Sequence, residues 1–315
     1  MQSERFSKLK KPVRISVIGS INRDTVVLPD GRIEHGYGGI LYNVFGLSQL
    51  FRDRVAILPI CNVGSDIEKD VRGLLSKPTN VDIGAISFVD YTNNHCKLRY
   101  LRDGTRSEIF TGFVPAINSE QMKSALDSDI TLINFISGRD VTLRTLTTFR
   151  REYSGMVYID FHTLSLGLHR DGTRFLRKPK RWMQYFNLCD FMQMNGDEFE
   201  LLSGLKPDDK NVREFFIRLD SPEPRCLLVT LGSDGAIMAF RGKNGIETVH
   251  QTLHREHFKV TDTTGAGDLF TAGFIAGLAL KMSLKRCLEL AVSAGSEGCG
   301  FLHPQDVRFR KTRLL

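Results

Sequence analysis

The segment Thr261–Asp268, with the sequence T-D-T-T-G-A-G-D, contains the residue types in this chain that are best suited to chemistry. Gly265, Ala266 and Gly267 are small and lead into a long apolar stretch that is typical of a buried helix. Backbone N–H groups at a helix start have no helical partner and lie at the positive end of the helix dipole, so this turn could bind an anion. The adjacent Asp268 could accept a proton from an attacking hydroxyl group, or it could act as the N-cap of the helix. The residues alone leave both roles open.

Polar residues and glycines also follow several short apolar runs. Gly19, Asp160, Asn195 and Gly232 stand at the ends of such runs. Ligands of open α/β sheets bind beyond the carboxyl ends of the strands, so we expect these four positions at one edge of a sheet. Close by, Glu198 is a hard oxygen ligand that could hold magnesium through water, or it could be a solvated carboxylate at a helix start.

The elements that must position these residues alternate between strands and helices. Near-continuous apolar runs indicate strands that are buried on both faces, as in a parallel sheet covered by helices. Helical periodicity appears between them, in 119–126 and 212–219. This order predicts an α/β fold with a mostly parallel sheet. The predicted strands are Arg14–Gly19, Ile130–Ser137, Val157–Asp160, Phe191–Asn195 and Cys226–Gly232.

One region breaks this alternation. Residues 85–114 are rich in strand-forming residues, contain turn signals and lack a helical period. Together with residues 25–37 they could form a small separate sheet. Such a sheet is either a peripheral hairpin or a lid over a site, and the pattern alone favours neither.

Composition narrows the class of protein. The 315 residues are 41% hydrophobic and 25% charged, which allows a sizeable core. No apolar run approaches the roughly 20 residues of a membrane span, so no membrane partner is expected. Six cysteines without a C-x-x-C pair argue against a zinc ribbon and indicate buried reduced thiols in a cytoplasmic protein. The net charge of +7 favours anionic partners such as nucleotides. Residues 1–13 are expected to form a tail without the apolar core of a secretory signal.

Several motifs together resemble one family. D-T-T-G-A-G-D resembles the C-terminal signature of the ribokinase-like (PfkB) carbohydrate kinases, and other pieces occur in that family's order. The resemblance spans about residues 14–303 and implies a three-layer α/β/α fold with a small β lid. It implies a kinase domain over 14–315 with lid segments at about 25–37 and 85–114. The further pieces are Gly19–Asp24, similar to the family's first strand; Gly38–Asn43, similar to its Gly-Gly turn; Asn195–Glu198, matching its N-x-x-E motif; and Thr230–Gly232 with Gly235, resembling its nucleotide-binding strand end.

The resemblance implies ATP-dependent phosphorylation of a hydroxyl on a sugar or polyol, with Mg2+ and a monovalent cation such as K+. Relatives often dimerise through the lid, so a homodimer is conceivable here. For most of these residues a plainer role in a turn, a strand end or a helix start also stays open. The implied roles are catalysis for Asp268 with the anion hole of Gly265, Ala266 and Gly267; substrate binding for Asp24, Gly38, Gly39 and Asn43; ATP binding for Asn195, Thr230, Gly232 and Gly235; magnesium binding for Glu198; and monovalent cation binding for Asp262 and Thr264.

The acceptor molecule stays open. A nucleoside would be favoured by an apolar lid contact such as Tyr37 or Phe88 stacked on its base. A sugar phosphate would require a cationic pocket. The candidates for such a pocket are Arg99, Arg102, Arg106 and Arg139.

A rival from another class is a non-catalytic nucleotide- or nucleic-acid-binding protein on a kinase fold. It is motivated by the basic residues between 170 and 181, around Trp182, although a solvated helix face is the favoured interpretation and no nucleic-acid partner is expected. Three positions depart from the family pattern. They are Cys287, which leaves the adenine pocket unassigned; the bulky run Ile40, Leu41 and Tyr42 after the Gly-Gly turn; and Asp160-Phe-His162, where fructokinase-like members show Asp-Pro-Asn.

Overall fold

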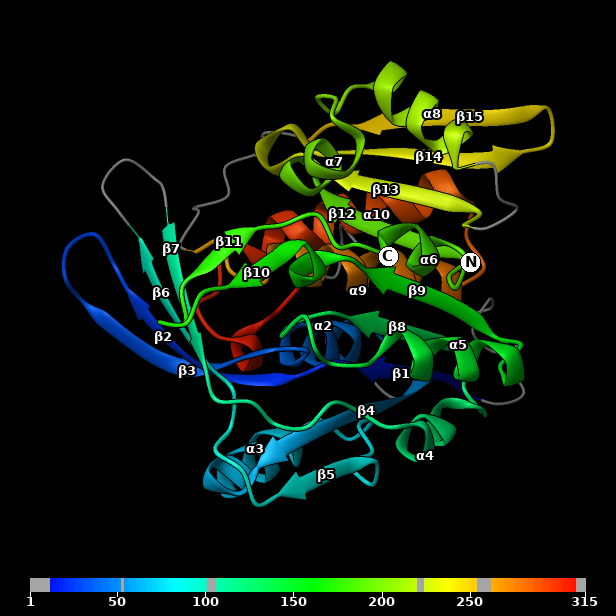
Figure 1. The fold of residues 1–315 in the computed structure, drawn as a ribbon. Helices are drawn as coiled ribbons and strands as arrows, with labels where there is room; N and C mark the ends of the chain where they lie inside the picture. Colours follow the sequence, from blue (N-terminus) through cyan, green and yellow to red (C-terminus); the bar gives the residue numbers. More distant parts are fainter. Residues whose placement is uncertain (1–11, 52–53, 101–105, 220–223, 254–261, 310–315) are drawn as a thin grey trace.

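Nine strands form one central sheet in the computed structural model, in the order β15-β14-β13-β12-β9-β8-β1-β4-β5 (Figure 1). The strands from β13 to β5 are all parallel to their neighbours, while β14 and β15 add an antiparallel edge. The structure describes residues 12–51, 54–100, 106–219, 224–253 and 262–309, so most of the predicted tail lies outside it. The strands are β1 (Val13–Ile18), β4 (Val55–Gly64), β5 (Ile86–Val89), β8 (Ile130–Asn134), β9 (Met156–Asp160), β12 (Phe191–Asn195), β13 (Cys226–Thr230), β14 (Ala236–Gly242) and β15 (Gly245–Gln251).

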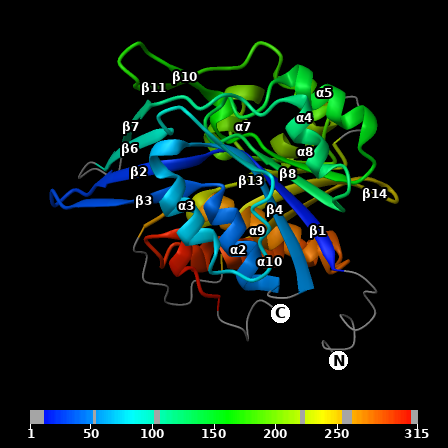
Figure 2. The same ribbon diagram turned by 90° about the horizontal axis from the view of Figure 1, so that it is seen from below.

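Helices cover both faces of this sheet, which confirms the predicted α/β/α architecture. Alternate side chains of a strand point to opposite faces, and in β13 Leu228 joins one core cluster whereas Leu227 joins the other. Figure 2 shows α2, α9 and α10 on one side of the strands and α4, α5 and α8 on the other. The helices are α2 (Leu41–Phe51), α3 (Glu68–Leu75), α9 (Ala266–Ala279) and α10 (Leu284–Gly298) with the first cluster, and α4 (Ser119–Met122), α5 (Leu143–Glu152), α6 (Trp182–Phe186), α7 (Gly196–Ser203) and α8 (Asp209–Arg218) with the second.

A second sheet of four strands projects from one end of the first (Figure 1). Its order is β3-β2-β6-β7, with β2 antiparallel to β3 and parallel to β6. The segment 85–114 is divided between the two sheets: β5 pairs with β4 of the central sheet, and only β6 and β7 join the small one. A strand pattern does not reveal which sheet a strand will join. The small sheet consists of β2 (Ile21–Val27), β3 (Ile33–Gly39), β6 (His95–Tyr100) and β7 (Arg106–Thr111).

A short hairpin connects the small sheet to the central one. Its strands are β10 (Leu166–Leu168) and β11 (Arg174–Leu176), and the N–H of Phe110 in β7 donates to Gly172 O at its tip. The predicted helix face between 170 and 181 is therefore wrong, because this segment forms β11 and the loops around it. Arg174 is not solvated either, since its side chain is 5% exposed and pairs with Glu108 at 2.8 Å.

The carboxyl ends of the central strands meet at the edge beneath the small sheet. Register pairs Asn134 with Asp160 across β8 and β9, and Asn195 with Thr230 across β12 and β13. The predicted convergence of strand ends is confirmed. Five of the six cysteines are buried and none is in a disulfide, as expected for reduced thiols. Among the described helices, none combines the length and apolar character that crossing a membrane requires.

Candidate active site

The Gly265–Gly267 turn opens helix α9 at this sheet edge. Gly265 is the N-cap residue and has a left-handed backbone with φ of 79°, which favours glycine because it has no Cβ. The N–H of Ala266 donates to Thr263 O at 3.2 Å, so the turn itself uses this group. Within the described part of the chain, the N–H groups of Gly265 and Gly267 have no acceptor. These two groups are therefore available to an anion at the positive end of the helix.

Asp268 is the third residue of α9, directly after this turn. Its carboxylate is not the N-cap, because Gly265 holds that position and no side chain caps the helix. The N-cap alternative for Asp268 is therefore wrong. Its side chain is almost completely buried, and this burial raises its pKa to about 7, while a hydrogen bond from Asn134 acts in the opposite direction. A carboxylate that ionises near neutrality is well matched to accepting a proton.

Two asparagines hold Asp268 in place. Asn134, at the end of β8, donates from Nδ2 to Asp268 Oδ1 at 2.6 Å and to Asn43 Oδ1 at 2.9 Å. Asn43, in α2, donates from its own Nδ2 to the backbone oxygen of Asp268 at 2.9 Å. Asn43 is completely buried and both of its polar atoms have protein partners, so the structure places it behind the carboxylate. Sequence reasoning missed Asn134, although it ends an apolar run just as Asp160 does.

A cavity of about 1000 Å³ lies above Asp268 and joins the predicted substrate and nucleotide residues. On the side of the small sheet, Asn22, Asp24 and Glu108 face it. No described residue donates a hydrogen bond to Asp24, and the buried Asn22 Oδ1 also lacks a partner. Burial raises the pKa of Asp24, and the nearby carboxylates of Glu108, Asp268 and Asp262 raise it further. This side of the cavity therefore offers hydrogen-bond acceptors to a ligand that brings donors.

The Gly-Gly turn brings the backbone close to Asp24. A Cβ at Gly38 would clash with Asp24 Oδ2 and would push the carboxylate from its present position. Gly39 has a left-handed φ of 68°, and a Cβ there would meet the backbone oxygen of Ser20. Gly39 is thus required by its backbone, and Gly38 leaves room for the Asp24 carboxylate at the wall of the cavity.

The opposite side of the cavity is formed by the ends of β12 and β13. Asn195 caps α7 and its Oδ1 accepts from the N–H of Glu198, whose Oε2 accepts from the N–H of Asn195; both distances are 2.9 Å. The N-x-x-E motif is therefore a capping box. Glu198 is not a solvated carboxylate, because its side chain is buried and burial raises its pKa to about 8. Thr230 and Gly232 line the same cavity, and Gly235 has a left-handed φ of 89° in the turn that follows.

The oxygens on this side are suited to a divalent cation. Asn195, Asp197, Glu198 and Glu200 all line the cavity, and Glu198 has no described cationic partner. No group of three metal-binding side chains occurs within the described ranges. Magnesium commonly uses only one or two carboxylates together with substrate phosphates and water. These side-chain oxygens therefore fit a magnesium ion that is coordinated mainly by substrate phosphates and water.

A buried network of side-chain hydrogen bonds, which the sequence did not predict, lies between the small-sheet side and the β12–β13 side of the cavity. Gln193 in β12 donates from Nε2 to Asp160 Oδ2 at 2.9 Å and accepts from Thr271 of α9. Burial raises the pKa of Asp160, and the charges of Asp268 and Glu198 contribute. The network ties β9, β12 and α9 together directly beneath the cavity.

Asp262 and Thr264 form a turn before α9. Asp262 Oδ1 accepts from both the N–H and the hydroxyl of Thr264 at 2.9 Å, and Tyr100 of β6 donates to the same oxygen at 3.2 Å. The N–H of Asp262 donates to Cys299 O, so the turn also contacts the end of α10. The small sheet thus touches the loop that leads into the Gly265–Gly267 turn.

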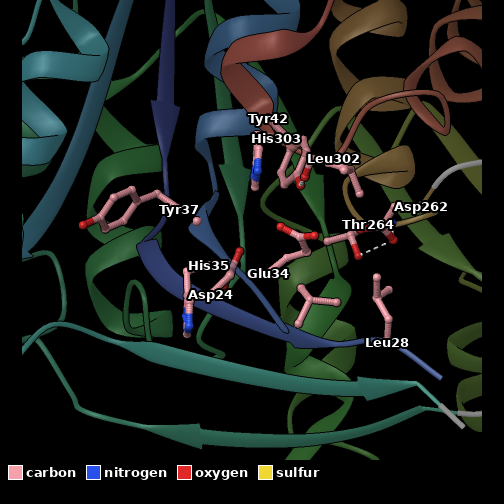
Figure 3. A pocket seen from close by; sticks show the side chains of 12 residues that line it. Asp24, Leu28, Glu34, His35, Tyr37, Tyr42, Asp262, Thr264, Leu302 and His303 are labelled. Carbon is pink, nitrogen blue, oxygen red and sulfur yellow. Dashed lines mark hydrogen bonds between the residues drawn. The ribbon is translucent and has the colours of Figure 1, made fainter. Parts of the chain in front are cut away.

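The residues named for other acceptors, as far as the structure describes them, lie apart from the cavity. Tyr37 donates from its hydroxyl to Asp70, and its ring lies aside from the residues around Asp24 (Figure 3). The ring of Phe88 lies under Arg72 at 4.1 Å. Among the arginines, Arg99 and Arg139 are exposed and do not line the cavity, whereas Arg102 and the side chain of Arg106 lie outside the described residues.

Comparisons with known proteins give matches to kinases. The model of the pfkB family of carbohydrate kinases matches residues 173–300. An ATP-dependent 6-phosphofructokinase from Thermoanaerobacterium thermosaccharolyticum is 33% identical over 49% of this chain, but the match covers only 44% of that relative. A cytidine kinase from Thermococcus kodakarensis is 21% identical over 89% of this chain and 94% of its own length.

The fold agrees as well. The structure of Arabidopsis thaliana ribokinase complexed with ribose and ATP superimposes with a TM-score of 0.75 at 19% identity, over 96% of this chain and 98% of that one. The three-layer architecture with its small β sheet is thus a ribokinase-like fold. The family match covers the C-terminal part of the chain, and together with the fold it confirms the resemblance to the ribokinase-like (PfkB) carbohydrate kinases that the motifs indicate.

Proposed function

We propose that this protein transfers the γ-phosphoryl group of ATP to a hydroxyl of a sugar or sugar-like molecule. The observation that carries the proposal is the position of Asp268. A buried carboxylate with a pKa of about 7 follows a turn with two unused backbone N–H groups and faces the same cavity as Asp24. A base, an anion site and a polyol site are thus present within one cavity, as phosphoryl transfer to an alcohol requires.

In the proposed reaction Asp268 accepts the proton of the attacking hydroxyl. The N–H groups of Gly265 and Gly267 stabilise charge on the transferring phosphoryl group. Asp24 accepts hydrogen bonds from other hydroxyls of the acceptor and so orients it. The small sheet acts as a lid that limits the access of water, which would otherwise compete as acceptor.

The nucleotide occupies the side of the cavity formed by Asn195, Thr230, Gly232 and Gly235. Magnesium, when bound, neutralises charge on the triphosphate, and Glu198 would hold it through water. Asp262 and Thr264 would hold a monovalent cation beside the turn. In this proposal Asn43 holds the backbone of Asp268 and the side chain of Asn134 rather than the acceptor.

A nucleoside acceptor is the second candidate. The cytidine kinase relative, which aligns over nearly the whole chain, favours it. Tyr37 and Phe88 lie away from the cavity, so neither provides the aromatic contact expected for a nucleobase.

The test is an ATP-consumption screen over sugars, polyols, sugar phosphates and nucleosides with the wild type and Asp268→Asn. Removing a general base costs about 10²–10⁴-fold in rate, whereas binding of ATP should persist. Asp127→Asn, at an exposed carboxylate, is the matched control and should keep wild-type turnover. If the Asp268→Asn variant keeps more than about a tenth of the wild-type turnover, Asp268 is not the general base.

A further inference from the structure

Tyr42 is the one bulky residue after the Gly-Gly turn that faces the cavity. Ile40 and Leu41 are completely buried and belong to the core cluster of α2 and α9. Tyr42 instead lines the cavity together with Asp24 and Asp268. Packing explains the first two residues and leaves the third without an assigned role.

The ring of Tyr42 lies between the acceptor side and the anion turn. A Cβ on Gly38 would be 3.4 Å from Tyr42 Cε2, and a Cβ on Gly265 would be 2.5 Å from Tyr42 Cε1. One edge of the ring therefore contacts the Gly-Gly turn and the other contacts the first glycine of the anion turn. Burial raises the pKa of the Tyr42 hydroxyl, and Asp24, Asp262 and Asp268 add to this effect, so the hydroxyl remains protonated.

The ring is held firmly in this position. Only 4% of the residue is exposed, and its hydroxyl donates to Leu302 O at 3.3 Å. Leu269 of α9 and Val307 pack against it in a small cluster of buried residues. Because α9 and the stretch from Leu302 to Val307 both hold the ring, we expect it to act as a fixed wall.

A second, smaller cavity shares part of its lining with the first. It has a volume of about 20 Å³, and Glu34, His35 and His303 line it (Figure 3). Asp24, Tyr42 and Thr264 line both cavities. Of these three shared residues, Tyr42 has by far the largest side chain.

We propose that Tyr42 determines the size of the acceptor and restricts it to a monosaccharide-sized polyol. This inference rests on the proposed function, because it requires Asp24 to bind the acceptor and Asp268 to activate it. A polyol held between these two carboxylates lies against the ring of Tyr42 on the side of the Gly-Gly turn. A nucleoside carries a further ring on its sugar, and on this side it would have to displace a buried aromatic side chain.

The experiment compares kcat/KM for ribose and a matched hexose with kcat/KM for adenosine and cytidine. Wild type should prefer the monosaccharides, and Tyr42→Phe should keep this preference because the ring remains. Tyr42→Ala joins the two cavities and should raise the nucleoside-to-monosaccharide ratio by about 10-fold or more, the scale set by a difference in pocket contacts. Tyr42→Leu is measured alongside, in case the alanine variant is poorly folded. Tyr91→Ala, at a residue that is 54% exposed, is the control and should leave the ratio unchanged.

Two outcomes overturn the inference: a wild type that uses nucleosides as efficiently as monosaccharides, or folded Tyr42→Ala and Tyr42→Leu variants with an unchanged ratio. Failure of the proposed function gives a different result, since no acceptor would then be phosphorylated by any variant. Calorimetric binding of the same four acceptors without ATP tests the size limit independently of turnover.

Discussion

Asn134 should set the pH at which the enzyme becomes active. Its Nδ2 donates to Asp268 Oδ1 at 2.6 Å in a site where burial holds the pKa of Asp268 at about 7. A hydrogen bond to a charged group contributes about 1.5–3 kcal/mol, and one pKa unit corresponds to about 1.4 kcal/mol. Asn134→Ala removes a bond that favours the ionised form, so the inflection of the kcat–pH profile should move upward by about 1–2 pH units.

The sign of the effect follows from the role of the base. Asp268 accepts a proton only when ionised, so the rate rises with pH through its pKa and then reaches a plateau. With the upward shift, Asn134→Ala should be about 5- to 50-fold slower than the wild type at about pH 7. The two rates should converge near about pH 9.5, where both carboxylates are ionised. If Asn134 had a purely structural role, its substitution would lower the rate by the same factor at every pH.

The assay is single-turnover transfer from ATP across this pH range, with the best acceptor from the screen. Asn187→Ala, at an exposed asparagine, is the matched control. Thermal melts and ATP binding show whether Asn134→Ala is folded, since the loss leaves Asn43 Oδ1 without its donor. An unmoved inflection in a folded Asn134→Ala protein would refute the argument that this hydrogen bond tunes the base.

Three further predictions follow from individual carboxylates. Asp24→Ala should weaken the acceptor far more than ATP, because it removes hydrogen-bond acceptors that have no other described donor; an unchanged acceptor KM and kcat would contradict this role. Glu198→Gln should raise the magnesium concentration needed for half-maximal activity without changing acceptor binding, and a titration identical to that of the wild type would leave Glu198 with its capping role alone. Stability without ligands should fall as pH rises from about 4 to about 8, since the raised pKa values of Glu198 and Asp268 make the folded state bind more protons than the unfolded state in this range. Melting temperatures of the wild type and Glu198→Gln measure this, and the variant should lose less stability on the alkaline side.

Local patterns in the sequence determined most of the fold. Apolar runs such as that of β13 alternate between the two core clusters, so a strand buried on both faces is readable from its own residues. The Gly265–Gly267 turn was predictable because the helix start and its glycines are neighbours in sequence. The N-x-x-E motif likewise encodes a capping box within four residues. The membership of β5 in the central sheet was not predictable, since it depends on pairing with β4.

Only the tertiary structure decided how the catalytic carboxylate is held and what surrounds it. Asn134 and Asp268 are 134 positions apart, and Asn43 reaches the backbone oxygen of Asp268 from α2 across 225 positions. No local pattern marks such partners, because they meet only where the parallel strands end and α9 begins, at one edge of the sheet. For the same reason the sequence showed Tyr42 merely as a bulky residue after two glycines. Its place beside Gly265 and Leu302 arises from packing between distant segments, where burial also raises the pKa values of Asp24 and Asp268.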